Sequence, residues 1–489
     1  MLKKPLVFAS VIYAVAVFMS VGAYHPDEHF QILEFAAYKL GHTGVGNLAW
    51  EFSERMRSGF QPFLVVVLHH LWLSFGIDNP FFEVLMLRLL SACLSALVIV
   101  KIIKLYLPIV GDIGLKKTLV SLMLLGWCLP FFNVRFSSEC LSASLFWLGF
   151  VAYFNEKTKS NFLNYLCVGL LFGLSFLARF QVGLMLFGFG LSILCIQKQT
   201  FKPILMLCLG FGFALFLGFL MDKWLYGEWT FSAWNYVKQN LVEGKAAQFG
   251  TEPFYYYLAV VLERAVPPFS VAMVLGVLGV VVWQPKNVLT WIIVPFLVVH
   301  SIIGHKEFRF LMPLIHVVPL CVVLSLQHIR THKPKIDAWI NRYLAWFPKV
   351  FWVANFVLLF NVFIPADVSV WLYQEIYNRA KSPKNYLFFS NQNPYIISPD
   401  FPMVVNTFYQ PKNLVCLPKD SLLAMKNVDK NAVYLLDIDT LNTNKTLIVN
   451  NLEFNKIFQT IPDFVTHFDA TGWSKKLNIH CLYRLENKP

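Results

Sequence analysis

The sequence predicts an α-helical polytopic membrane protein with about 11 transmembrane helices, followed by a small extracytoplasmic α/β domain at its C-terminal end. Hydrophobic residues make up 57% of the 489 residues and charged residues only 14%, which is more apolar surface than a soluble domain buries. The apolar residues form separate long runs up to about residue 364, and the rest of the chain is polar. We therefore expect a transmembrane module over residues 1–364 and a soluble domain over residues 365–489.

Eleven apolar runs approach the roughly 20 residues that a helix needs to cross a bilayer. They cover residues 5–22, 82–107, 118–134, 139–155, 162–178, 182–197, 203–221, 267–283, 288–303, 310–327 and 345–364. The first run lacks a small-residue cleavage site, so we expect a retained helix rather than a signal peptide. A shorter stretch, 62–76, contains His69 and His70 and favours an interfacial helix.

The basic residues predict the orientation of these helices. The formal net charge of +13 does not indicate nucleic-acid binding, because lysines and arginines lie in short loops between apolar runs. With a cytoplasmic N-terminus, the loops on the same side carry Lys116, Lys117, Lys157, Lys159, Lys198, Lys202, Lys286, Arg330, Lys333, Lys335 and Arg342. The positive-inside rule then places loops 23–61, 222–266 and 304–309, together with the C-terminal domain, on the outer side.

The polar tail contains short runs that are typical of strands. These runs cover residues 386–389, 403–408, 432–438, 446–449 and 480–485, and Pro418 precedes a predicted helix at 422–425. Cys416 and Cys481 are the two cysteines of the tail, and the sequence leaves open whether they form a disulfide. No Cys/His spacing indicates a zinc site.

A cluster of polar residues directly follows the first apolar run. A charged side chain costs about 2.5–3.5 kcal/mol or more inside lipid, so this cluster must face water or a lined cavity. Asp27 and Glu28 are adjacent and would diverge by about 100° on a helix, so we expect only one of them to act as a base. The same loop supplies further polar candidates, namely His25, His29, Gln31, Glu51 and Arg57.

A second cluster lies at the outer end of the ninth apolar run. His305, Lys306 and Arg309 provide three potential cations around Glu307, and aromatic residues flank them. Such a group suits a phosphate held near the lipid surface, although interfacial anchoring by lysine and arginine is the simpler alternative.

Aromatic residues are frequent in the outer loop 222–266. Trp229, Phe254, Tyr255 and Tyr256 could stack on a sugar or form part of the aromatic belt at the membrane surface, and composition leaves this undecided. Two further polar pairs lie at outer helix ends, Arg135 with Glu139 and Arg179 with Gln181. For these pairs a structural ion pair or an interfacial anchor is the favoured interpretation. A carboxylate and a cationic cluster on one side of the membrane suit a lipid-linked phosphosugar donor.

Four segments resemble signatures of the family 22 mannosyltransferases of the GT-C superfamily. Residues 25–31 resemble the HPDE-type motif of the first loop, and residues 48–51 with 57–58 are similar to the TWE…RS segment. Residues 249–254 resemble the YGT-x-PW loop, with Phe254 in place of the usual tryptophan, and residues 305–310 resemble the HKE-x-RF signature. The segments follow the order of the family and span residues 24–310.

The resemblance implies a GT-C-like fold and an inverting transfer of mannose. The donor would be a polyprenyl (dolichyl-type) phosphate mannose and the acceptor a lipid-linked glycan, resembling a GPI or N-glycan precursor, on the lumenal or periplasmic face. By this analogy Asp27 is the catalytic carboxylate and Glu28 its supporting acid. His305, Lys306 and Arg309 would contact the phosphate or the acceptor. The resemblance implies neither a metal nor a cofactor beyond the donor.

Three other readings remain open at this stage. A lipid-linked sugar transporter or flippase is the main alternative, although transporters usually place ionisable groups near the membrane midplane. The chain could also use a sugar other than mannose, or act as a non-catalytic subunit of a glycan-assembly complex. The chain is compact and has one sequon, at Asn444, which leaves room for a bacterial relative that lies in the inner membrane and acts in the periplasm. A eukaryotic protein would lie in the membrane of the endoplasmic reticulum.

Overall fold

The computed structural model describes residues 2–155, 161–380, 384–390, 392–398, 404–424, 432–439, 446–450, 452–460 and 479–485. The sequon at Asn444 lies outside these residues. The chain divides into two compact units: unit 1 comprises residues 1–20, 51–64 and 85–364, and unit 2 comprises residues 21–50, 65–84 and 365–489. Unit 2 therefore groups part of the first outer loop and residues 65–84 with the C-terminal domain.

Unit 1 is built from helices. Two helices, α5 (Phe60–Ser74) and α6 (Pro80–Tyr106), contribute residues to both units, as does the short α4 (Trp50–Ser53). The other helices of the first half are α1 (Lys3–Met19), α7 (Ile113–Leu125), α8 (Cys128–Asn133), α9 (Ser138–Tyr153), α11 (Phe162–Ala178), η2 (Phe180–Val182), α12 (Gly183–Cys195) and α13 (Phe201–Tyr226). Those of the second half are α14 (Ser232–Val237), η3 (Lys238–Val242), η4 (Lys245–Phe249), α15 (Tyr256–Arg264), α16 (Phe269–Trp283), α17 (Val288–Ile302), η5 (Phe308–Leu314), α18 (Val318–His332), α19 (Pro334–Tyr343), α20 (Phe347–Leu358) and η6 (Leu359–Phe363).

Each of the eleven predicted apolar runs overlaps one of these helices. By length and composition two helices, α6 and α13, could each cross a membrane alone, and three bent helix pairs bring this number to five among the described residues. The axes of α16 and α17 meet at 115° across a short turn that contains Pro285, and proline cannot continue a helix. The expected count of 11 spans therefore remains a prediction, while the helical character of the runs is confirmed.

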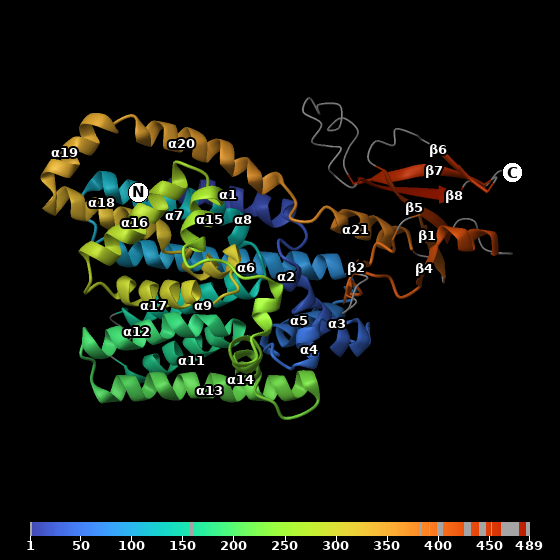
Figure 1. Cartoon of the computed structure of the whole chain (residues 1–489), viewed down its shortest axis with the longest axis horizontal. Coiled ribbons are helices and arrows are strands. Elements are labelled where there is room, and N and C mark those ends of the chain that lie inside the picture. Colours follow the sequence, from blue (N-terminus) through green and yellow to red (C-terminus); the bar gives the residue numbers. More distant parts are fainter. Residues whose placement is uncertain are drawn as a thin grey trace. The chain divides into compact units, whose positions relative to one another are not determined.

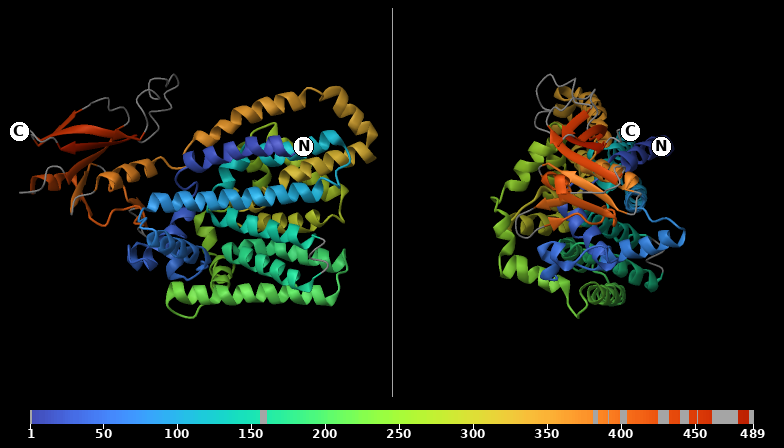
Figure 2. Two further views of the ribbon diagram at one scale, coloured as in Figure 1. Left: turned by 180° about the vertical axis from the view of Figure 1, so that it is seen from behind. Right: turned by 90° about the vertical axis from the view of Figure 1, so that its right-hand side faces the viewer.

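The helices of unit 1 pack side by side in pairs, which Figures 1 and 2 show from three directions. Helix α11 contacts both α9 and α13, α12 contacts α17, and α16 contacts α18. Their shared core is mainly aliphatic, and Phe146, Trp147 and Phe150 of α9 are among its largest fully buried side chains. The Trp147 indole also donates a hydrogen bond to the Pro313 carbonyl oxygen at 2.8 Å, which joins α9 to η5.

Glycines allow two of these helix pairs to touch through their backbones. A Cβ atom at Gly169 of α11 would overlap the carbonyl oxygen of Leu207, and one at Gly210 of α13 would overlap that of Leu166. The same applies to Gly188 of α12 against the Trp291 carbonyl oxygen of α17. Small residues at such contacts are typical of helix packing in membranes, where close van der Waals contact replaces the hydrophobic effect.

Unit 2 combines short helices with a mixed sheet. Its helices are α2 (Pro26–Phe30), α3 (Leu33–Lys39), η1 (Val45–Asn47), α21 (Ser369–Arg379) and η7 (Lys419–Ala424). The six-stranded sheet has the order β4-β1-β5-β8-β7-β6, with β1 parallel to β4 and β5 and the other pairs antiparallel. Its strands are β1 (Asn385–Phe389), β4 (Leu414–Pro418), β5 (Val433–Asp439), β6 (Thr446–Val449), β7 (Leu452–Gln459) and β8 (Ile479–Leu485), and a separate pair joins β2 (Ile396–Ser398) to β3 (Val404–Val405).

Four of the five predicted tail strands coincide with strands of the sheet, and the fifth, 403–408, is reduced to the two residues of β3. The predicted helix at 422–425 begins earlier, as η7, and Met425 lies outside the described residues. The alternative that Cys416 and Cys481 form a disulfide is wrong, because both are free thiols. They lie on β4 and β8, three strand spacings apart in the sheet, or roughly 14 Å at about 4.8 Å per spacing. A disulfide needs Cα atoms within about 7 Å.

Substitution of Gly210 by alanine should weaken the packing of α11 against α13. The added Cβ atom has no room beside the Leu166 carbonyl oxygen, so we expect a loss of about 1–3 kcal/mol in the free energy of unfolding. Gly212 on the same helix has open space around its Cα atom, so Gly212→Ala should be neutral. Thermal unfolding of the two purified variants in detergent would compare them, and equal midpoints would contradict the close backbone contact.

Candidate active site

The acidic motif of the first loop forms the short helix α2 of unit 2. His25 caps this helix, since its Nδ1 accepts a hydrogen bond from the Asp27 backbone N–H at 3.3 Å, and Pro26 occupies the first helical position. The Glu28 carboxylate turns back and accepts the Tyr24 backbone N–H at 3.1 Å. The Asp27 carboxylate lies 3.6 Å from His25 Nδ1 with 22% of its side chain exposed. The two acids thus contact different groups, and the Asp27 side chain is partly exposed.

His29 of the same motif is buried in a network inside unit 2. Its Nε2 lies 2.7 Å from Oε1 of Glu34, which is fully enclosed. The Glu34 carboxylate also accepts the backbone N–H groups of Thr407 and Phe408 at 2.8 and 2.9 Å, and the Thr407 hydroxyl at 2.5 Å. The prediction that His29 contacts a substrate remains untested, but this geometry favours a structural role for its ring.

Aromatic stacking extends this network. The His29 ring stacks on Tyr409 with centroids 5.4 Å apart, and Phe81 stacks on the same tyrosine at 4.8 Å. Tyr373 of α21 follows at 6.1 Å and stacks in turn on Tyr395. Gln31, another predicted contact, is also buried and ends α2 through its backbone. The stacked and hydrogen-bonded residues around α2 therefore hold in place the helix that carries the partly exposed Asp27 carboxylate.

The second predicted cluster lies in unit 1, in the turn between α17 and η5. Lys306 is 5% exposed, and its ammonium group donates to the carbonyl oxygens of Glu252 and Gly304 at 2.6 and 3.3 Å. The Glu252 backbone N–H returns a hydrogen bond to the Gly304 carbonyl at 2.9 Å. The motif at 249–254 and the motif at 305–310 thus form one structure, and burial lowers the pKa of the Lys306 ammonium group.

Glu307 organises the remaining cations of this turn. Its carboxylate takes both Nε and Nη2 of Arg309, at 2.5 and 3.0 Å, in a bidentate pair. It also lies 3.0 Å from His305 Nε2, and this hydrogen bond raises the pKa of the imidazole. His305 Nδ1 lies 3.0 Å from the Gly250 carbonyl oxygen. A carboxylate that holds an arginine and a histidine in fixed positions is suited to presenting them to an anion.

Glu139 and Arg179 join this cluster, although the sequence indicated for them only a local structural pair or an interfacial anchor at a helix end. Glu139 Oε1 lies 2.7 Å from Arg179 Nη1 and 3.4 Å from Arg309 Nη1, and all three side chains are at least nine-tenths buried. Arg179 is also within electrostatic range of Arg57. In the sequence, the polar residues at these two helix ends were the available signal for this network. That signal did not indicate that Glu139 pairs with Arg309, 170 residues further along the chain.

The remaining motif residues of unit 1 belong to a set of hydrogen bonds that joins the segment after α4 to the end of α13. Arg57 Nη2 lies 3.4 Å from Glu51 Oε1, and the Tyr226 hydroxyl donates to the Arg57 carbonyl oxygen at 2.6 Å. Asp222, which was not predicted, accepts the Gly59 backbone N–H at 2.8 Å and the Ser232 hydroxyl at 2.5 Å. These bonds fasten the segment after α4 to the end of α13.

The predicted aromatic residues differ in their surroundings. Trp229 stacks on Phe219 with centroids 4.9 Å apart and lies under the Lys223 ammonium group at 3.8 Å, which favours its belt interpretation. Phe254 and Tyr255 are about two-thirds exposed, at 63% and 66%, and Tyr256 begins α15. Phe254 and Tyr255 are therefore accessible for stacking on a substrate.

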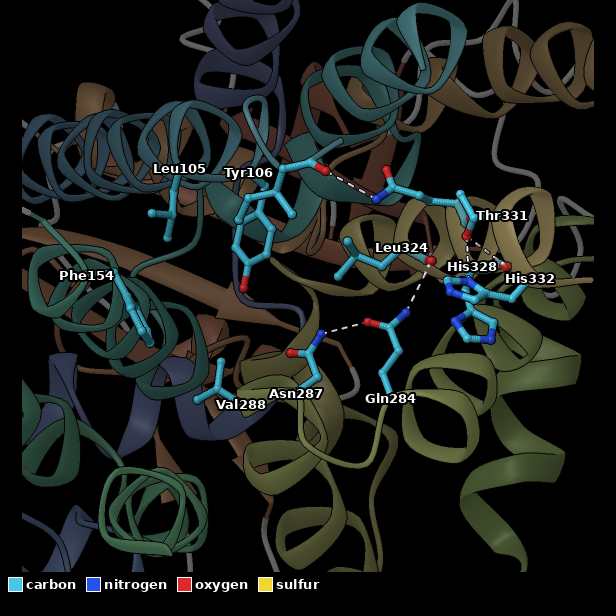
Figure 3. A pocket seen from close by; sticks show the side chains of 12 residues that line it. Leu105, Tyr106, Phe154, Gln284, Asn287, Val288, Leu324, His328, Thr331 and His332 are labelled. Carbon is cyan, nitrogen blue, oxygen red and sulfur yellow. Dashed lines mark hydrogen bonds between the residues drawn. The ribbon is translucent and has the colours of Figure 1, made fainter. Parts of the chain in front are cut away.

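A pocket of about 440 Å³ lies elsewhere in unit 1, between the ends of α6 and α18 and the turn from α16 to α17 (Figure 3). Gln284 and Asn287 are hydrogen bonded across it at 2.9 Å, and its walls are mostly apolar. None of the predicted site residues lines this pocket.

The Glu139→Gln variant should destabilise unit 1. It removes the charge that two buried guanidinium groups share, and breaking a buried pair costs about 3–5 kcal/mol because the partner charge remains. Asp112→Asn is a matched control, because Asp112 pairs with Arg330 on the exposed surface and asparagine retains its N-cap hydrogen bond to Leu115. Chemical or thermal unfolding of both variants tests this. A change below about 1 kcal/mol for Glu139→Gln would show that the network is dispensable.

Comparisons with known proteins agree with the family that the motifs suggested. A model of the Alg9-like mannosyltransferase family matches residues 6–402. The chain is 28% identical over 312 residues to Mannosyltransferase APTG1 of Arabidopsis thaliana, covering 62% of this chain and 54% of that protein. It is 25% identical over 338 residues to GPI alpha-1,2-mannosyltransferase 3 of Homo sapiens, covering 67% and 58%.

Two more distant similarities complete the comparison. A Schizosaccharomyces pombe protein named as a probable Dol-P-Man:Man(7)GlcNAc(2)-PP-Dol alpha-1,6-mannosyltransferase is 27% identical over 195 residues, 39% of this chain and 34% of that protein. The crystal structure of the Archaeoglobus fulgidus oligosaccharyltransferase gives a TM-score of 0.43 at 14% identity, covering 79% of this chain and 60% of that chain. The chain thus matches little more than half of the length of the first curated relatives. Since the family model covers most of its residues, the chain belongs to the Alg9-like mannosyltransferase family.

Proposed function

We propose that this protein transfers mannose from a polyprenyl phosphate mannose, of the dolichyl type, to a hydroxyl group of a lipid-linked glycan. Membership of the Alg9-like mannosyltransferase family is the observation that carries this proposal. Relatives that are named as GPI mannosyltransferases and as a Dol-P-Man-dependent enzyme favour the same donor and a membrane-bound acceptor.

The acceptor in this proposal is a GPI precursor. Six of the curated relatives carry the name GPI alpha-1,2-mannosyltransferase 3 or a name that differs only in omitting the linkage, from human, mouse, fly, cattle, zebrafish and Yarrowia lipolytica. An N-glycan precursor is the second candidate, favoured by the fission-yeast relative. Mass spectrometry of the glycolipids that accumulate after deletion of the gene distinguishes the two, because the unfinished acceptor identifies itself by its mass.

In the proposed reaction Asp27 is the general base. Its carboxylate takes the proton of the acceptor hydroxyl while that oxygen attacks C1 of mannose, and the bond from C1 to the phosphate oxygen breaks. Attack opposite the leaving group inverts the configuration, and polyprenyl phosphate departs with the bonding electron pair. The partial exposure of the Asp27 carboxylate and its place in the family's acidic motif support this choice.

The leaving phosphate gains negative charge as the bond breaks, so cations in fixed positions stabilise the transition state. We assign this role to His305, Lys306 and Arg309. The bidentate bond of Arg309 to Glu307 and the two carbonyl bonds of Lys306 hold both groups before the donor binds. Fixed donors need little reorganisation during the reaction, which is the physical basis for their contribution to the rate.

The proposal includes an orientation. Helices long and apolar enough for a membrane make the chain a membrane protein, and the loop charges favour a cytoplasmic N-terminus. The motif-bearing loops and the C-terminal domain would then lie in the lumen of the endoplasmic reticulum, or in the periplasm if the protein is bacterial.

The Asp27→Asn variant should lose mannose transfer by about 100- to 10,000-fold, because the amide cannot accept the proton. Transfer of radiolabelled mannose from polyprenyl phosphate mannose into a membrane lipid extract measures this. The Asp112→Asn variant loses an exposed carboxylate without touching the proposed site and should retain full activity. A transfer rate that is unchanged in Asp27→Asn contradicts the assignment of the base. Wild-type protein that moves the donor across liposomes without forming product would instead support the flippase.

Lys306→Ala should raise the KM for the donor and lower kcat, because the phosphate loses a cation in both the bound and the transition state. Lys306 also bridges two carbonyl groups, so part of the effect would come from a looser loop. Lys306→Arg keeps the charge and should recover part of the activity. Steady-state kinetics of wild type, Lys306→Ala and Lys306→Arg, with melting temperatures as a folding control, distinguish the effect of the lost charge from the effect of a looser loop. Equal kinetic constants for wild type and Lys306→Ala would remove Lys306 from the mechanism.

A further inference from the structure

Unit 2 contains a cluster of metal-ligating side chains that the transfer reaction does not use. His69 lies on α5, Glu83 lies in the first turn of α6, and Asp78 lies in the connecting turn. One ligand atom from each of the three lies within 4.8 Å of the others. His69 and Glu83 are buried at 9% and 4% exposure, and Asp78 is exposed. The cluster thus combines an imidazole with two carboxylates at the surface of the unit.

The turn between the two helices holds these groups in place. Asn79 caps α6, since its side-chain oxygen accepts the backbone N–H groups of Phe81 and Phe82 at 2.9 and 3.2 Å. Gly76 has φ +75°, which allows the chain to leave α5 sharply. The Tyr377 hydroxyl donates to the Asp78 carbonyl oxygen at 2.8 Å and ties the turn to α21. His69 Nδ1 and Glu83 Oε1 are already only 2.8 Å apart.

A second imidazole lies beside the cluster. The ring centroids of His42 and His69 are 6.3 Å apart, and the His42 side chain makes no hydrogen bond within the described residues. Two imidazoles on one zinc ion have centroids roughly 5–6 Å apart, given zinc–nitrogen bonds of about 2.1 Å. Lys412, Asp78 and Glu34 also lie within electrostatic range of His42. His42 is therefore placed to complete a four-ligand set after a small movement.

We propose that His69, Asp78 and Glu83, with His42 as the fourth ligand, form a binding site for a divalent transition metal of the zinc class. Imidazole nitrogen suits zinc and its neighbours, whereas magnesium and calcium prefer sites made of oxygen alone. Two carboxylates neutralise the charge of a divalent ion. Zinc–ligand bonds of about 2.0–2.2 Å require ligand atoms roughly 3.3 Å apart, which the exposed Asp78 reaches by rotation of its side chain.

The metal would act on structure rather than on the transfer chemistry. Glu83 is two residues from Phe81, whose ring stacks on Tyr409, and Tyr409 stacks on His29 of the Asp27 helix. Fixing the start of α6 to α5 therefore stiffens the aromatic stack that supports α2. The simpler alternative is a hydrogen-bonded pair of His69 and Glu83 that binds no metal, and the experiment distinguishes the two.

The test uses the full-length protein purified in detergent without chelators. Elemental analysis by inductively coupled plasma mass spectrometry should find about one zinc equivalent per chain, or zinc added after chelation should bind with that stoichiometry. His69→Ala and Glu83→Gln should each weaken zinc binding by more than the roughly 10- to 100-fold that loss of a mere supporting residue costs. His70→Ala is the matched control, because His70 is the exposed neighbour of His69 on the same helix and should leave binding unchanged.

A folding measurement covers the case in which a variant is unstable. Chelation of wild-type protein should lower its melting temperature, zinc should restore it, and magnesium should not. Absence of zinc binding to wild-type protein overturns the proposal, as does an affinity that is equal in wild type, His69→Ala and Glu83→Gln. Mannose transfer is assayed separately with labelled donor, so a failed metal site leaves the proposed function standing, and a failed transfer assay leaves the metal site standing.

Discussion

The polar centre of unit 1 depends on the pairing of buried charges around Glu139. A buried guanidinium group without a counterion costs several kcal/mol, and Glu139 serves two of them, Arg179 and Arg309. Glu307 then takes the other face of Arg309 and the ring of His305. Three segments far apart in sequence, the start of α9, the end of α11 and the turn before η5, are therefore fixed together. The geometry of residues 305–309 therefore depends on this whole set and not on those residues alone.

In unit 2 a buried carboxylate is stabilised mainly by hydrogen bonds from backbone groups. The enclosed Glu34 carboxylate has no arginine within the network described above. Instead its carboxylate accepts two backbone N–H groups and a hydroxyl from Thr407 and Phe408, which lie 373 and 374 positions further along the chain. It also contacts His29. Hydrogen bonds to the charged form stabilise a carboxylate in a buried place. This arrangement binds the first-loop motif to a segment of the C-terminal region.

The sequence was informative where a local pattern carries the answer. Apolar runs became helices because their length and composition admit no other structure in lipid, and the tail strands followed from their β-branched and aromatic residues. Lys306 and Arg309 were recognised because they belong to a local sequence motif at residues 305–310. Glu34 and Asp222 were missed, since their partners are distant and neither lies in a motif. Glu139 and Arg179 were noted only as local pairs, because nothing in their neighbourhood points to Arg309. The disulfide alternative for Cys416 and Cys481 failed since strand order is not readable from the spacing of two cysteines.

The glycine contacts of unit 1 bear on how a long isoprenoid tail could reach the protein from the side. At Gly169 and Gly210 between α11 and α13, and at Gly188 between α12 and α17, the helices approach each other so closely that a Cβ atom would overlap a main-chain carbonyl oxygen. At these glycines no side chain can rotate aside to admit a hydrocarbon chain. The exposed surface of α13 carries Leu209, Phe213 and Phe216, each about half exposed, as suits a helix that contacts lipid. In the proposed reaction the isoprenoid tail of the donor would therefore enter between helices whose contacts consist of movable side chains.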